Sequence, residues 1–279
     1  MLYPMQTESR LCLPLDGIWN FALIPYGETY DPGESLRDGR PMPVPSSYND
    51  IYEGREVRDH IGDVVYERTL EIPPVPANSR VFLRFGSVTH SCRVYWNGEL
   101  LGSHKGGFLP FEFDVTGIRK PGTNRLTVIA DNIIDHTTLP VGTLQEKEVP
   151  GLGKWLMDFP NFDFFNYSGI MRPVKLLILP ENHIESIMIY GTAEGKFRYR
   201  IETAGSGTLR LEMLDGQTVI WTGESAEGEG QIENARCWSP DDPHLYALRV
   251  TFTDTAGCRD VYTEKFGFRS VEVKDCAVY

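Results

Sequence analysis

The sequence has no long hydrophobic run and no apolar N-terminal leader. No window approaches the roughly 18 consecutive apolar residues that suggest a membrane-spanning helix. The first ten residues, MLYPMQTESR, have neither a basic flank nor an apolar core, so we expect no secretory signal. Both absences favour a protein of the cytoplasm.

Paired cysteines are also absent. The five cysteines lie at positions 12, 92, 237, 258 and 276 and form no C-x-x-C pair. An odd and scattered set argues against a disulfide framework and against a cysteine-rich metal site. Reduced thiols in a cytoplasm are the simplest interpretation. A single disulfide, such as Cys237 to Cys258, stays open as an alternative.

Positive charge is in short supply. Lys and Arg total 27 against 39 Asp and Glu, which gives a formal net charge of -12 at pH 7. An acidic surface repels nucleic acid and anionic membranes, so we expect neither as a partner. Hydrophobic residues make up 41% of the chain, a share that allows the substantial core of a globular protein.

The common catalytic motifs are missing. The sequence contains no G-x-S-x-G elbow, no H-E-x-x-H and no P-loop. Its six histidines are dispersed without metal-ligand spacing, so we predict no metal site and no cofactor. GSHKGG at 102–107 follows a hairpin with no helix after it and indicates a turn. Asp241 and Asp242 are flanked by prolines and indicate an exposed turn, although a catalytic carboxylate pair stays open there.

What the sequence does contain is apolar alternation, which predicts strands. The alternating segments are 64–72, 80–85, 111–115 and 125–130. Asn97-Gly98 predicts a hairpin with a type I′ turn, because both central residues of that turn need positive φ. Asp215-Gly216 repeats the pattern, and a short helical turn is expected within 46–54. With 27 Gly and 19 Pro between these segments, the predicted class is all-β.

The strands are too numerous for one small sandwich. Pro180, Glu181 and Asn182 interrupt two apolar runs, and we place a boundary there. We predict a jelly-roll sandwich over residues 1–180 and an immunoglobulin-like sandwich over residues 181–272. The second has the length of about 100 residues typical of that architecture. The polar stretches 25–62 and 133–162 are expected to be long irregular loops.

One acid lies among aromatic residues. In NFDFFNYSGIMRPV, residues 161–174, three phenylalanines and a tyrosine surround Asp163. An isolated buried carboxylate is costly, so Asp163 either faces water or holds a partner. That partner could be Arg172, a loop amide or a ligand rich in hydroxyl groups. Carboxylates bind vicinal hydroxyls and aromatic rings pack on sugars, which makes Asp163 the candidate substrate-binding residue.

Seven segments, taken in order, resemble the family 2 glycoside hydrolases. They are LDGIWNFAL (15–23), VPSSYND (44–50), GDVVYERTLEIP (62–73), VTHSCRVYWNGELLGSHKGGFLPFEFDVT (88–116), DFFNYSGIMRPV (163–174), WSPDDPHLY (238–246) and FGFRSVEV (266–273). Each is modest alone, but the seven at their expected spacing are specific and span essentially the whole chain. The resemblance implies a jelly-roll sugar-binding domain and an immunoglobulin-like sandwich, which a TIM barrel follows in the family.

The resemblance implies an activity of which this chain holds only a part. Retaining hydrolysis uses two carboxylates, which are barrel glutamates in this family. Both are expected beyond Tyr279, so no catalytic residue is assigned here. Residues 273–279 resemble the start of the strand that leads into the barrel. The implied substrate is a β-D-glucuronide, with a β-galactoside enzyme or a stand-alone carbohydrate-binding module as alternatives.

The resemblance also implies roles for individual residues. The acid that opens DFFNYSG, here Asp163, reaches into the barrel's active site and binds ring hydroxyls. Gly169 is implied to serve a tight turn and Arg172 to orient the loop. The resemblance further implies a homo-oligomer for the complete protein, and it implies no cofactor.

Overall fold

The computed structural model describes residues 1–151 and 153–278. Its elements are almost all strands, which confirms the predicted all-β class. The chain forms two compact units: one comprises Leu13–Ala77 and Val81–Leu177, and the other comprises Met1–Cys12, Asn78–Arg80 and Ile178–Tyr279. Within the described parts, no helix has the length and apolar character to cross a membrane.

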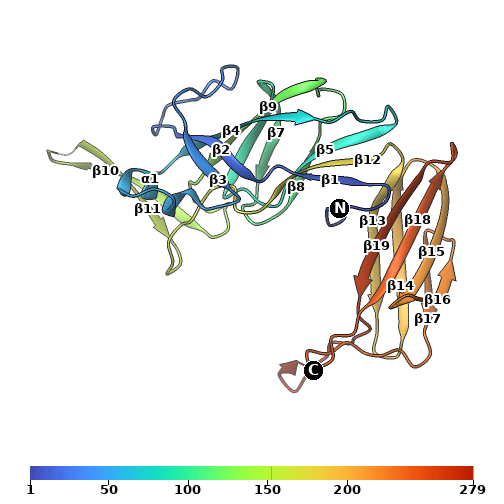
Figure 1. Ribbon diagram of the computed structural model, residues 1–279. Helices are drawn as coiled ribbons and strands as arrows, with labels where there is room; N and C mark the ends of the chain where they lie inside the picture. Colours follow the sequence, from blue (N-terminus) through green and yellow to red (C-terminus); the bar gives the residue numbers. More distant parts are fainter. Residues whose placement is uncertain (152, 279) are drawn as a thin grey trace. The chain divides into compact units, whose positions relative to one another are not determined.

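The first unit is a sandwich of a six-stranded and a four-stranded sheet (Figure 1). The six-stranded sheet runs in the order β3 (Arg40–Val44), β2 (Gly17–Leu23), β4 (Asp63–Ile72), β9 (Gly122–Asp131), β6 (Ser91–Trp96) and β7 (Glu99–Lys105). The four-stranded sheet runs in the order β1 (Leu11–Pro14), β12 (Val174–Pro180), β5 (Ser79–Phe85) and β8 (Phe111–Asp114). Two short helices, η1 (Tyr48–Asp50) and α1 (Arg55–Arg58), lie between β3 and β4 in the chain.

Alternation along these strands builds the first core. Successive strand residues point to opposite faces, and the aromatic side chains of β2 and β4 turn inward. The Phe21 ring lies 5.0 Å from that of Tyr66 and 5.5 Å from that of Tyr48, measured between centroids. Asn97 and Gly98 have φ of 53° and 90°, which confirms the predicted turn between β6 and β7.

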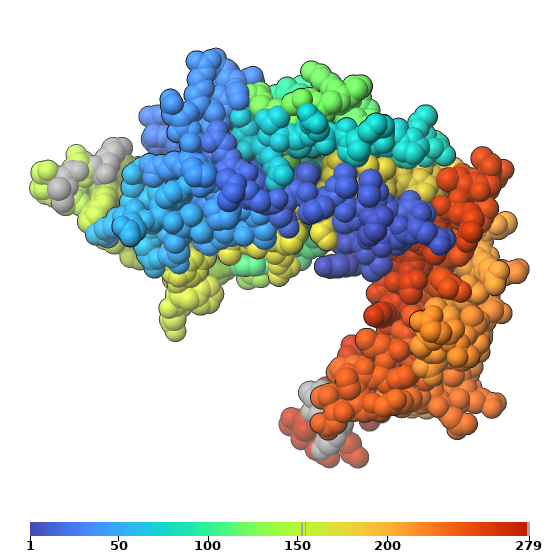
Figure 2. Space-filling model, in the orientation of Figure 1, coloured from blue at the N-terminus to red at the C-terminus, as the bar shows by residue number. Residues whose placement is uncertain are grey.

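Neither stretch predicted to be an irregular loop is wholly irregular, since 25–62 contains β3, η1 and α1. Much of the stretch 133–162 is a hairpin of β10 (Gly142–Val149) and β11 (Gly153–Pro160), paired antiparallel along their whole length. It projects from the first sandwich (Figures 1 and 2). The residues 145–148 are all exposed, so this strand lacks the apolar alternation by which the others were predicted.

The second unit holds a second sandwich. One sheet runs β13 (His183–Gly191), β14 (Lys196–Ala204) and β17 (Glu227–Gln231). The other runs β16 (Thr218–Gly223), β15 (Gly207–Asp215), β18 (Tyr246–Asp254) and β19 (Arg259–Phe266), and a short pair, β20 (Val273–Lys274) and β21 (Ala277–Val278), ends the chain. Its core gathers Phe197, Leu211, Val250 and Phe268, each at most 2% exposed.

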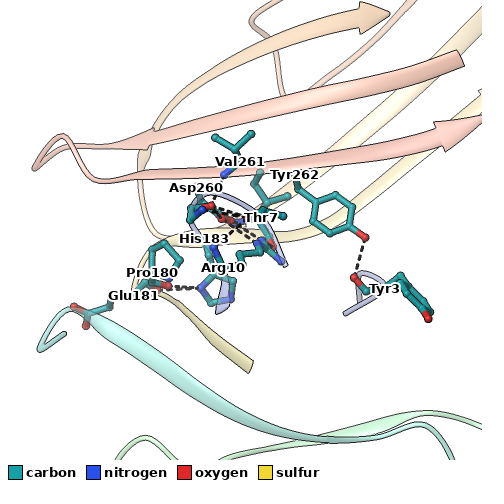
Figure 3. Close-up of polar contacts among 11 residues, drawn as sticks. Tyr3, Thr7, Arg10, Pro180, Glu181, His183, Asp260, Val261 and Tyr262 are labelled. Atoms are coloured by element: carbon teal, nitrogen blue, oxygen red, sulfur yellow. Dashed lines mark hydrogen bonds and ion pairs between the residues drawn. The ribbon is translucent and has the colours of Figure 1, made fainter. Parts of the chain in front are cut away.

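The N-terminal residues belong to this second unit, although the prediction placed them in the first domain. Leu2 is buried in the second core and Met5 packs against it. The Arg10 guanidinium, through Nε and Nη2, donates to both carboxylate oxygens of Asp260 at 2.9 and 2.5 Å, and the two side chains face each other in Figure 3. The Tyr262 hydroxyl donates to the Tyr3 carbonyl at 2.9 Å (Figure 3). These contacts join segments about 250 residues apart, which no local sequence pattern reports.

Candidate functional site

The candidate residue Asp163 lies in the loop between β11 and β12. Its side chain is exposed. Among the described residues, no hydrogen bond or ion pair joins it to Arg172, the partner that the sequence offered as an alternative. Arg172 instead donates from Nη1 to the Phe108 carbonyl at 3.2 Å. The loop therefore carries its acid at the surface while its arginine is attached elsewhere.

Asn166 anchors this loop through both ends of its amide. Its Nδ2 donates to the Asn132 carbonyl at 3.1 Å and to Asp158 Oδ2 at 2.8 Å. Its Oδ1 lies 2.6 Å from His90 Nε2. Because Nδ2 faces two acceptors, the oxygen must face the histidine, and His90 Nε2 must be the donor. Three separate segments thus hold one side chain three residues after Asp163.

The surroundings of His90 favour its neutral form. It is 2% exposed, and its Nδ1 is buried with no hydrogen-bond partner among the described residues. Burial lowers the pKa of His90, and the bond to Asn166 opposes that shift. A protonated ring would place a second N–H where no acceptor lies, so the neutral Nε2–H form is favoured. His90 therefore supports the loop through its hydrogen bond to Asn166.

The backbone of the loop docks against the segment before η1. The N–H groups of Ser46 and Tyr48 donate to the carbonyls of Ile170 and Ser168 at 2.9 and 3.2 Å. Gly169 lies between them with φ of 127°. A Cβ there would meet the Tyr66 hydroxyl at 2.6 Å and the Ser46 carbonyl oxygen at 3.0 Å. Only glycine suits this turn, in agreement with the role that the resemblance implied for it.

The aromatic residues around Asp163 divide into pairs. The rings of Phe162 and Phe164 lie 4.2 Å apart, and those of Phe165 and Tyr167 lie 4.9 Å apart. The Arg58 guanidinium covers Phe165 at 4.4 Å from its centroid. Phe164 remains 64% exposed. The second pair therefore ties the loop to α1, while Phe164 presents an apolar ring beside the exposed acid in sequence.

A depression of about 850 Å³ opens between α1, the hairpin strand β11 and this loop. Trp155 and Phe164 contribute apolar surface to it, whereas Arg58, His60 and Asp158 contribute polar groups. Burial raises the pKa of the Asp158 carboxyl against the lowering effect of its bond to Asn166. Burial lowers the pKa of His60. The surface thus combines aromatic faces with hydrogen-bonding groups, the two features that a sugar ring requires.

The loop and Asp163 could be predicted from the sequence, but the residues that bind the Asn166 side chain could not. Asn132, Asp158 and His90 lie on three different segments, and the contacts that unite them at Asn166 are set by the fold. Asn166 lies inside segment 163–174, which resembles the family, and this position was the one sign in the sequence that Asn166 has a role. No group of three or more histidine, cysteine or acidic side chains in the described residues could hold a metal ion.

Two family domains match the chain. The sugar-binding domain of the glycosyl hydrolases family 2 matches residues 13–180, and a second domain of the glycosyl hydrolases family 2 matches residues 186–269. The first begins where the first compact unit begins, at residue 13.

Two curated relatives named β-glucuronidase match nearly the whole chain. A β-glucuronidase of Streptococcus agalactiae is 38% identical over 98% of this chain and 46% of its own length. A β-glucuronidase of Paenibacillus borealis is 39% identical over 98% of this chain and 48% of its own length. The chain therefore spans about half the length of the curated relatives it matches.

Solved structures agree with these relatives. The Faecalibacterium prausnitzii β-glucuronidase is 42% identical with a TM-score of 0.89, covering 100% of this chain and 49% of that one. A Bifidobacterium dentium β-glucuronidase complexed with coumarin-3-O-glucuronide is 34% identical with a TM-score of 0.92, covering 100% of this chain and 52% of that one. With a family domain matched over more than half its length, this chain belongs to the glycosyl hydrolases family 2.

Proposed function

We propose that this chain is the non-catalytic N-terminal part of a retaining hydrolase of β-D-glucuronides, and that Asp163 supplies a ligand for the sugar hydroxyls. The name shared by the relatives, β-glucuronidase, supports the activity. A Ruminococcus gnavus β-glucuronidase in complex with D-glucuronic acid, 35% identical to this chain, supports the sugar class.

The observation that carries the role of Asp163 is its position. Its carboxylate is exposed on a loop whose following residues are fixed by Asn166, Ser168 and Gly169. A fixed loop holds the acid in place without using the acid itself. An ionised carboxylate accepts hydrogen bonds from two neighbouring hydroxyls, and such charge-assisted bonds are short and strong.

The chemistry would be divided between two parts of the complete enzyme. In retaining hydrolysis one carboxylate attacks the anomeric carbon, while a second gives a proton to the leaving oxygen and later takes one from water. By family resemblance both are barrel glutamates outside this chain. Asp163 would orient the ring for that attack and would take no part in proton transfer.

A chimera tests the proposal. This chain would replace the corresponding residues of the Streptococcus agalactiae β-glucuronidase, and chromogenic β-glucuronides and β-galactosides would be compared. We expect turnover of the glucuronide. Because the barrel of the chimera comes from a β-glucuronidase, the galactoside is a negative control, and a stable chimera without turnover of the glucuronide would contradict the assignment.

Partners and compartment follow as further parts of the proposal. We infer a catalytic barrel as the partner of these two sandwiches and a homo-oligomer for the complete enzyme. Among the described residues the five cysteines form no disulfide, and Cys237 and Cys276 are exposed, which supports a reducing compartment such as the cytoplasm. Light scattering of the complete enzyme would test the oligomer, with a monomer as the contradicting result.

A further inference from the structure

A second group of polar side chains lies on the outer face of the six-stranded sheet. Asp63 on β4 pairs with Asp131 on β9, which pairs with Ser91 on β6, which in turn pairs with Lys105 on β7. Four adjacent strands thus place these side chains in one row. Arg93 follows Ser91 on the same face, because residues two apart share a face of a strand.

This row borders a depression of about 460 Å³. That size falls within the roughly 300–1,000 Å³ of small-molecule sites. Pro25 to Glu28 also line it, and Tyr26 is 50% exposed. Ser103, which pairs with Arg93 across β6 and β7, adds a hydroxyl. We call this the outer-sheet groove.

The charges in the groove are only partly matched by each other. Arg93 forms an ion pair with Asp63, and Lys105 Nζ lies 3.2 Å from Asp135 Oδ2 outside the row. The Asp131 carboxylate is left with one hydrogen bond among the described residues, from the Ile133 N–H to Oδ1 at 2.9 Å. Like charges placed opposite each other on neighbouring strands destabilise a sheet. The pair of Asp63 and Asp131 is such an arrangement.

The groove contains charges of both signs, which disfavours a charged ligand. An anion would face two carboxylates, and a cation would face Arg93 and Lys105. A neutral polyol suits both signs, because each hydroxyl can donate to Asp131 and accept from the Arg93 guanidinium. The exposed Tyr26 ring in the lining offers an apolar face of the kind that packs on a pyranose.

We propose that the outer-sheet groove binds a neutral pyranose unit of a saccharide, with Asp131 and Arg93 as its principal hydrogen-bonding partners. Binding would let hydroxyl donors satisfy the Asp131 oxygen that has no partner among the described residues. The groove would give the jelly roll a saccharide contact made wholly by its own residues.

Saturation-transfer NMR and titration of the 279-residue chain with methyl β-D-glucopyranoside, methyl β-D-galactopyranoside and methyl β-D-xylopyranoside test this proposal. We expect saturable millimolar binding of at least one glycoside. Asp131→Asn and Arg93→Gln should each weaken it about tenfold or more, since each removes a charged hydrogen-bonding partner.

Two control variants sharpen the result. Glu99→Gln makes the matched carboxylate-to-amide change at the exposed start of β7, and Arg37→Gln makes the matched guanidinium-to-amide change at an exposed position outside the groove. Both should leave the affinity unchanged, and circular dichroism would confirm that all variants fold. The proposal is overturned if no glycoside shows saturable binding, or if Asp131→Asn and Arg93→Gln bind like the parent.

Discussion

At the scale of residues, the pair of Arg10 and Asp260 decides how the chain's beginning is held. Asp260 is fully buried, and it accepts hydrogen bonds from Arg10, the Ser9 hydroxyl at 2.8 Å and the Ile184 N–H at 2.8 Å. A buried charge without its partner is strongly unfavourable. The ten N-terminal residues are therefore a structural part of the second sandwich.

Replacing Arg10 should lower the free energy of unfolding by a measurable amount. Arg10→Met keeps much of the length but leaves Asp260 charged and unpaired, so we expect a loss of about 3–5 kcal/mol in the free energy of unfolding. Denaturant titration of the second unit's tryptophan fluorescence would measure it. The matched control is Arg259→Met, whose contact with Glu8 at 3.6 Å is exposed and should contribute less than about 1 kcal/mol. Equal losses for both variants would contradict this account.

The same pair predicts a pH dependence. Burial alone would raise the pKa of Asp260, but Arg10, Ile184 and Ser9 together hold that pKa below its ordinary value. A lowered pKa stabilises the fold above the unfolded value of about 3.9, and the contribution is lost as pH falls through the folded pKa. In Arg10→Met, burial raises the pKa of Asp260 because the arginine is gone. Protonation of Asp260 at low pH then removes the cost of its buried charge. The stability difference between parent and variant should narrow from pH 7 to below pH 4; a constant difference would contradict the pKa assignment.

At the scale of elements, the loop after β11 depends on a single backbone turn. Gly169→Ala forces a side chain into a positive-φ position and against the Tyr66 hydroxyl. Such a conformation costs about 1–3 kcal/mol, which should lower the melting temperature by several degrees. Gly117→Ala is the control, because a Cβ there meets nothing within 4 Å. Differential scanning calorimetry would compare the two, and similar melting temperatures would count against the proposed docking of the loop.

Strands with an apolar face could be predicted from sequence, and contacts between distant segments could not. The alternation at 64–72 and 125–130 is realised in β4 (Asp63–Ile72) and β9 (Gly122–Asp131). The hairpin of β10 and β11 was missed because residues 145–148 of β10 are polar and exposed, and the alternating apolar side chains of β11, Trp155, Met157 and Phe159, are exposed and belong to no core. In the candidate site, Asp163 followed from family resemblance, whereas the anchors at Asn166 required the fold.

At the scale of the whole molecule, the proposed placing of the catalytic groups in a barrel has a direct consequence for this chain. The chain itself should not hydrolyse a chromogenic glucuronide, because retaining hydrolysis needs two carboxylates that we assign to the barrel. The assay requires a preparation from a host that lacks glycosidases. Turnover above background by the chain alone would show that it holds catalytic groups of its own.

The central claim is that Asp163 binds the sugar, and one substitution tests it. Asp163→Asn in the active chimera keeps the side chain's shape but removes its charge. Hydrogen bonds to charged groups contribute about 1.5–3 kcal/mol, so kcat/KM should fall about tenfold to a hundredfold or more. The melting temperature of the 279-residue chain should be unchanged, because the exposed Asp163 has no hydrogen bond or ion pair among the described residues. Unchanged kcat/KM together with a clear loss of thermal stability would contradict the claim.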